Sequence, residues 1–121
     1  MVEEFQRIRQ ILFYKNYFHD FFDQQKKVVL EKINYVLFVV TIAKRIPLKF
    51  FKHVENVTGL YEIRIEYHGN IYRIFCCFDE GQVVVVFHGF HKRSQKLPGK
   101  EIDKAKKIMT AYFDSKIKPT T

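Results

Sequence analysis

The hydrophobic pattern of this chain changes near its middle. In residues 27–43 the apolar positions recur every three or four residues, which is the spacing of a helix with one buried side. Residues 59–98 instead are typical of three short strands joined by two tight glycine turns, and all five glycines lie between residues 59 and 99. The pattern predicts a mostly helical first half and a second half built from strands and tight turns.

The first half predicts a short strand followed by helices. Residues 7–14 are typical of a strand, and an apolar side spaced as in a helix follows over residues 14–25. With the helix at 27–43, these residues form a predicted helical hairpin, because almost no loop separates the two helices. Residues 48–54 are expected to add one more helical turn after Pro47.

The second half predicts a three-stranded antiparallel meander. Its strands are residues 61–67, 72–78 and 83–88, and two-residue hairpin loops are expected at 69–70 and 80–81. A helix with lysines on its outer side follows over residues 100–113. We therefore expect one α+β domain over residues 1–121.

The turns set the expected register of the strands. They pair Tyr67 with Tyr72, and Phe78 with Val83. One face of the meander is then an apolar core face: Tyr61, Ile63, Ile65, Tyr67, Tyr72, Ile74, Cys76, Phe78, Val83, Val85 and Phe87. The opposite face carries Glu62, Arg64, Glu66, Arg73, Phe75, Cys77, Val84, Val86 and His88, with Arg73 across from Glu66 and His88.

The charge of the chain favours an anionic partner. The 121 residues carry a formal net charge of +8, and the hydrophobic fraction of 47% excludes a disordered chain. Between His88 and Lys107 there are seven Lys or Arg residues and two acidic ones, so the positive field is densest after the strands.

The cysteines and apolar runs indicate a soluble cytoplasmic protein. Cys76 and Cys77 are adjacent, and neighbouring strand residues point to opposite faces, so they form a poor disulfide pair. The N-terminus has no apolar signal segment, and apolar runs such as residues 36–40 are far too short to span a bilayer. No Cys/His spacing for a metal and no phosphate-binding glycine motif is present, so we expect neither metal nor cofactor.

Three motifs, in this order, resemble one known family. They are LYEIR at 60–64, IYRI at 71–74 and HGFHKRSQK at 88–96, and ILFY at 11–14 and PLKFFKH at 47–53 support them. The chain resembles the RelE/HigB toxin superfamily, and within it the phage-derived Gp49-like branch. The resemblance covers nearly the whole chain.

The resemblance implies a fold and a function. The fold is RelE-like, with an N-terminal strand, a helical hairpin, a three-stranded antiparallel meander and a C-terminal helix. The function is that of a toxin of a type II toxin–antitoxin pair, a metal-independent endoribonuclease that cuts mRNA on the translating ribosome. Its partners would be a cognate antitoxin, the ribosome and mRNA. Two alternatives stay open, namely a ParE-like inhibitor of DNA gyrase and an inactive relic that binds only antitoxin or nucleic acid.

The candidate catalytic residues are Arg73, Arg64 and His88. RNA cleavage by the neighbouring 2′-OH needs cations at the phosphate and groups that move protons. The arginine fork suits the phosphate, and histidine suits proton transfer near neutral pH. The alternative is that each arginine forms an ion pair with Glu62 or Glu66.

The candidate RNA-binding residues are basic or polar and lie on either side of the meander. Cations beside aromatic rings suit single-stranded RNA, where phosphates pair with the cations and bases stack on the rings. The set comprises Lys52, His53, His91, Lys92, Arg93, Gln95 and Lys96. The alternative for the residues after the meander is a solvent-exposed connection to the last helix. For Lys52 and His53 it is a solvated, lysine-rich helix end.

Overall fold

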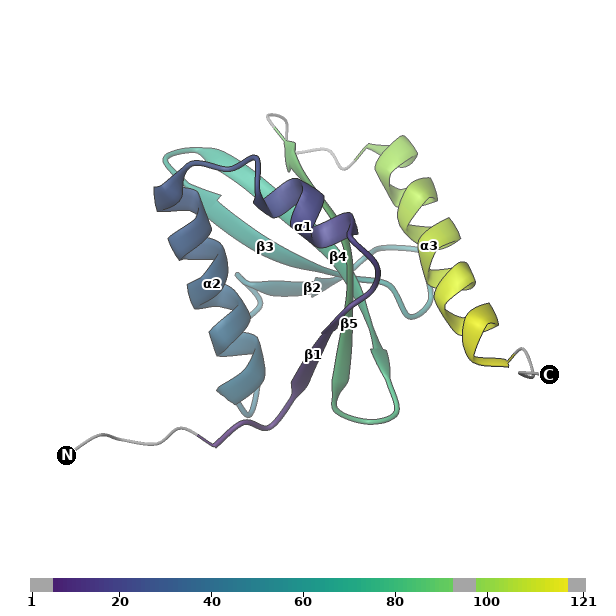
Figure 1. Cartoon of the computed structure of the whole chain (residues 1–121). Helices are drawn as coiled ribbons and strands as arrows, with labels where there is room; N and C mark the ends of the chain where they lie inside the picture. The colour runs from purple at the N-terminus through teal and green to yellow at the C-terminus, as the bar shows by residue number, and fades with distance from the viewer. Residues whose placement is uncertain (1–5, 93–97, 118–121) are drawn as a thin grey trace.

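The computed structural model describes residues 6–92 and 98–117, apart from the side chain of Lys92, and has an α+β fold (Figure 1). In chain order the elements are β1 (Gln10–Phe13), α1 (Tyr17–Phe22), α2 (Lys27–Ile42), β2 (Phe51–His53), β3 (Tyr61–Tyr67), β4 (Asn70–Asp79), β5 (Val83–Lys92) and α3 (Gly99–Ile117). The predicted strand, helix pair, meander and final helix are confirmed, although β1 and α1 are shorter than the sequence pattern suggests.

The described strands form one mixed sheet in the order β1-β5-β4-β3-β2. The antiparallel meander β3–β4–β5 lies at its centre, β1 pairs in parallel with β5, and β2 pairs antiparallel with β3. The helical turn predicted over residues 48–54 is wrong in its second part, because residues 51–53 form β2. One turn forms after Pro47, whose carbonyl accepts from the N–H of Phe51 at 3.1 Å, and the chain then extends along the edge of β3.

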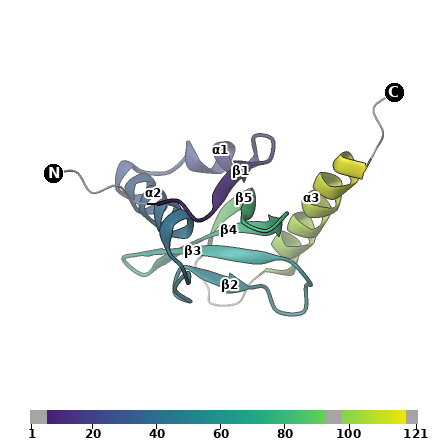
Figure 2. The same cartoon turned by 90° about the horizontal axis from the view of Figure 1, so that it is seen from below.

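The sheet is covered on both faces (Figure 2). Residues of α1 and α2 pack with Ile63, Ile65 and Ile74 on one face, whereas Ala105, Ile108 and Tyr112 of α3 pack on the other. The central strand β4 is buried from residue 71 to 77. Such two-sided cover explains why the strand reads as a nearly continuous apolar run.

The first hairpin turn lies one residue earlier than predicted. His68 and Gly69 have positive φ angles of 49° and 79°, so they form the two-residue loop, and Tyr67 pairs with Asn70 instead of Tyr72. The predicted register is therefore wrong by two residues. Because the side-chain period of a strand is two, the predicted faces of β3 and β4 are preserved.

The second hairpin turn is one residue longer than predicted. Asp79 pairs with Val83, and Phe78 pairs with Val84 instead of Val83. A shift of one residue moves every side chain to the other face, so the predicted faces of β5 are wrong here. Val84 and Val86 belong to the α1/α2 core, while residues 83, 85 and 87 face α3.

A bulge in β5 changes the alternation again. Ile74 pairs with Gly89 and Cys76 with Val86, so Phe75 alone lies opposite the two residues 87 and 88. A bulge re-aims the side chains that follow it. His88 therefore lies on the α3 face, which is where the sequence analysis placed it, although the predicted register of the preceding residues was wrong.

Candidate active site and nucleic-acid interface

The α3 face of the sheet contains a buried ion pair between Arg73 and Glu62. Arg73 lies on β4 and Glu62 on β3, and a guanidinium nitrogen (NH1) of the arginine donates to Oε1 of the glutamate. The residues are 5% and 3% exposed, respectively. The predicted surface ion pair is thus present for Arg73, but it is buried. The pairing offsets part of the free-energy cost of burying each charged group away from water.

The strand neighbours of Arg73 differ from the predicted ones. Arg73 lies opposite Arg64 on β3 and Phe90 on β5, so the expectation that it faces Glu66 and His88 is wrong. The cause is the position of the two turns and of the bulge. Glu62 reaches Arg73 along the diagonal between the two strands, a distance that long side chains span easily.

His88 lies on the same face as this pair, beneath the start of α3. It is 4% exposed, and its ring centroid is 5.1 Å from that of Phe75. Its Nε2 lies 3.3 Å from Oε1 of Glu101, which belongs to the first turn of α3. The contact brings together two residues 13 positions apart in the sequence, and it depends on how α3 packs on the sheet.

The surroundings of His88 favour its neutral form. Burial lowers the pKa of His88 below its ordinary value of 6.5, and the positive charge of Lys104 lowers it further, whereas Glu101 acts in the opposite direction. If Nε2–H donates to Glu101, Nδ1 carries the free lone pair. A neutral imidazole in that tautomer is suited to accept a proton.

Three buried side-chain atoms of this face have no hydrogen-bond partner in the described structure. They are Oε2 of Glu62, Nε of Arg73 and Nδ1 of His88. Buried polar atoms are nearly always paired in folded proteins, because leaving them unpaired costs free energy. Three such atoms on one face single it out as the candidate site.

The third catalytic candidate, Arg64, lies directly opposite Arg73 on β3, at the part of that strand's outer edge with which β2 does not pair. It is partly exposed and lines a groove with Lys32 and Lys49 at the outer edge of β3. Its backbone N–H donates to the carbonyl of Phe50 at 2.8 Å. Arg64 therefore shares its strand face with Arg73 and His88, but it differs from them in being partly exposed and in lining this groove.

Lys52 and His53 lie on the edge strand β2, and both are exposed. Lys52 pairs in register with Glu62, so it lies on the same face as the buried ion pair. His53 points to the opposite face and contacts the ring of Tyr61 at 5.2 Å between centroids. Of these two candidates, only Lys52 borders the candidate active site.

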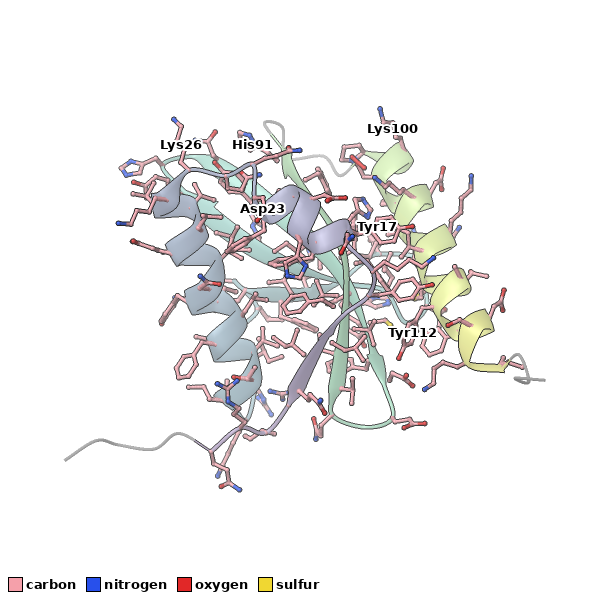
Figure 3. The ribbon with its side chains drawn as sticks, in the orientation of Figure 1. Tyr17, Asp23, Lys26, His91, Lys100 and Tyr112 are labelled. Carbon is pink, nitrogen blue, oxygen red and sulfur yellow. The ribbon has the colours of Figure 1, made fainter. Side chains whose placement is uncertain are left out.

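His91 lies at the other end of the sheet. Its ring stacks on that of Tyr72 with centroids 4.5 Å apart, and its Nε2 lies 3.0 Å from Oδ1 of Asn70. In Figure 3, His91, Lys26 and Lys100 all lie at this end of the molecule. Lys92 closes β5, whereas Arg93, Gln95 and Lys96 lie outside the described residues.

The two cysteines are poor nucleophiles. Both are buried and free. Burial raises the pKa of Cys76 well above its ordinary value, and burial followed by the charge of Asp79 raises that of Cys77 to about 12. Both thiols stay protonated at neutral pH, in agreement with a packing role.

Sequence reasoning missed the partner of His88 and the groove around Arg64. Nothing in the sequence marks Glu101 as a histidine partner, because the contact exists only once α3 is docked. The groove depends on the short length of β2.

Within residues 6–92 and 98–117, no group of His, Cys, Asp and Glu side chains is arranged to hold a metal ion. Nor is any described helix long and apolar enough to cross a membrane.

Comparison with known proteins gives one family. The model of the family described as "Phage derived protein Gp49-like (DUF891)" matches residues 19–110, which run from within α1 to within α3. No curated protein matches the chain. The matched residues include Arg73, His88 and Glu101.

Proposed function

The chain belongs to the phage-derived Gp49-like family, a family of HigB/RelE-like toxins, and on this premise we propose that it is a ribosome-dependent endoribonuclease. In this proposal it cuts translated mRNA without a metal ion and is neutralised by a cognate antitoxin. The family match carries the toxin assignment. The Arg73–His88 face supports the nuclease assignment, because it combines a phosphate-binding group with a proton-transfer group.

The proposed reaction is attack of a 2′-OH on the adjacent phosphorus, which forms a 2′,3′-cyclic phosphate, with departure of the 5′ oxygen, which takes up a proton from water. Arg73 binds the phosphate and stabilises the charge that builds up in the transition state. His88, whose Nδ1 is buried in the structure, accepts the 2′-OH proton through Nδ1 once bound RNA has opened this face; burial lowers the pKa of His88, and Glu101 holds Nε2. Lys52, on the edge of the same face, adds a cation where RNA approaches.

The buried ion pair shapes this mechanism. The guanidinium of Arg73 is paired with Glu62, so a phosphate must replace that carboxylate to reach it. Exchanging one anion for another keeps the charge of Arg73 balanced. The exchange takes the cation away from Glu62, so the carboxylate of Glu62 must move toward water when the phosphate binds.

The proposal is tested by expressing the chain alone in bacteria and mapping new mRNA 5′ ends. We expect growth arrest with cuts inside translated codons, and loss of those cuts when translation is blocked. His88→Gln should abolish the cuts in a protein that still folds, because glutamine cannot act as the base. Arrest with intact mRNA would overturn the nuclease assignment and move the target to DNA gyrase; unchanged cutting by folded His88→Gln would overturn the role of this histidine.

A further inference from the structure

A groove that is distinct from the buried site of Arg73 and His88 runs between α2 and the outer edge of β3. It is lined by Lys32, Tyr35, Lys49, Phe50, Arg64 and Glu66, and its volume is ≈ 560 Å³. A second hollow shares Lys32 and Tyr35 with it and extends it past Val28 and Glu31 to Tyr67. We call the two together the α2–β3 groove. Its size is that of a ligand-binding cleft.

The groove exists because β2 is shorter than β3. The pairing of β2 with β3 ends at Ile63, and the last described hydrogen bond across this edge runs from the N–H of Arg64 to Phe50. β3 continues to Tyr67, and within the described residues no strand covers that part of its edge. By the alternation of a strand, the backbone N–H of Glu66 points to the same side as that of Arg64. The open edge therefore offers a backbone donor beside the cations.

The polar lining of the groove suits an anion. Lys32, Lys49 and Arg64 oppose one carboxylate, Glu66, so the first hollow carries an excess of two positive charges (three minus one). None of the three cations forms an ion pair with a described residue. The one carboxylate of the extension belongs to Glu31, and Lys49 and Arg64 line only the first hollow. Charge thus favours an anion at the end formed by Lys49 and Arg64.

The aromatic lining suits a stacked base. The side chain of Tyr35 is 54% exposed, and its ring contacts Phe50 edge-to-face with centroids 6.1 Å apart. Lys49 places its Nζ 4.9 Å from the centroid of Phe50. The contact holds the Tyr35 ring in place while much of it stays open to solvent. A ring fixed beside cations is the arrangement that binds single-stranded nucleic acid without reading its sequence.

We propose that the α2–β3 groove binds single-stranded RNA. Arg64, Lys32 and Lys49 hold backbone phosphates, and Tyr35 stacks with a base. RNA fits this lining better than an acidic peptide, because an acidic side chain uses the cations but has no ring to stack on Tyr35. The groove leads toward Tyr67, whose ring contacts His68 at the end of the sheet that carries His91. The proposal requires RNA binding but no cleavage, so it stands apart from the nuclease assignment.

The test measures binding of the whole chain to a fluorescent single-stranded RNA of about ten nucleotides by anisotropy. Arg64→Ala should weaken binding and reduce the slope of log affinity against log salt by about 0.7, which is the contribution of one phosphate contact on a single strand. Tyr35→Ala should weaken binding about tenfold, whereas Tyr35→Phe, which keeps the ring, should bind like the wild type. Glu66→Gln should strengthen binding.

The matched control is Lys106→Ala, which removes one charge from an exposed lysine of α3, on the far side of the molecule from α2 (Figure 1). Equal weakening by Lys106→Ala and Arg64→Ala would show binding by overall charge alone and overturn the proposal. Absence of RNA binding by the wild type would also overturn it, as would groove variants that bind RNA normally but lose the antitoxin. RNA binding that depends on Arg64 and Tyr35, together with no mRNA cutting in cells, would support RNA binding by the groove. It would refute only the proposal that the chain is a nuclease.

Discussion

The buried ion pair makes Arg73 a residue whose removal affects folding before it affects function. Arg73→Met takes away the only described partner of Glu62, a carboxylate whose side chain is 4% exposed. Removing one member of a buried pair costs about 3–5 kcal/mol, because the remaining charge is left uncompensated away from water. The free energy of unfolding of a domain of this kind is about 5–15 kcal/mol, so such a loss is a large part of the total.

Replacing both members has a different expected result. Glu62→Met combined with Arg73→Met removes both charges and keeps similar side-chain volumes in a mostly apolar surrounding. Exchanges of buried pairs for apolar residues are often neutral, or stabilising by about 1–4 kcal/mol. The double variant should therefore be much more stable than Arg73→Met alone, with a coupling of at least about 2 kcal/mol between the two sites.

Urea unfolding followed by circular dichroism measures both effects. With a slope of about 2 kcal/mol per M, Arg73→Met should lower the urea midpoint by about 2 M, and the double variant should regain most of that loss. A midpoint for Arg73→Met within about 0.3 M of the wild type would refute the reasoning, since it would mean that Glu62 does not depend on Arg73. Equal losses in the single and double variants would refute it as well.

Three further predictions follow from other contacts. Gly89→Ala should destabilise the fold by about 1–3 kcal/mol in urea unfolding, because its Cβ would lie 2.6 Å from Cδ2 of the Phe21 ring. Burial lowers the pKa of His88 in the folded state, so the unfolded state binds the proton more tightly. The free energy of unfolding should therefore fall as the pH drops below 6.5. His88→Gln should flatten that part of the plot of unfolding free energy against pH. Asp79→Asn should lower the pKa of Tyr112 from about 12, since burial and then the 2.6 Å hydrogen bond to this carboxylate raise it, and ultraviolet titration measures the change.

Helix α2, whose apolar residues recur with a clear helical period, was predictable from the sequence. Strand β2, which is held in place by its neighbour β3, was not. The period of 3.6 in residues 27–43 predicted α2 almost to its ends. β2 has three residues, too few to show an alternation, and it is extended because β3 offers an edge to pair with. Pairing of this kind is decided by tertiary structure and leaves no local pattern.

The faces of β5 show a second limit of sequence reasoning. Residues 83–86 are four consecutive valines, so nothing in the pattern says which of them face α1 and α2. The choice rests on one extra residue in the preceding turn, and a shift of one residue inverts both faces. β3 alternates polar and apolar residues, and there the predicted faces are correct.

The candidate site was predictable as a face but not as a set of contacts. Alternation placed Glu62 and Arg73 together, and the ion pair was among the alternatives for that arginine. Their burial could not be read from the strands, because it depends on what covers the sheet. The contact between His88 and Glu101 needed both the bulge and the position of α3.

The stability of the fold does not by itself require the charged residues of this face. A well-packed apolar pair at the positions of Glu62 and Arg73 would satisfy the fold at least as well as the ions do. Leaving Nδ1 of His88, Nε of Arg73 and Oε2 of Glu62 without described partners costs further free energy. Natural proteins keep such features where activity requires them. A double methionine variant that folds at least as stably as the wild type would show that the ion pair is not there for stability, and a role in chemistry or binding would remain as its reason.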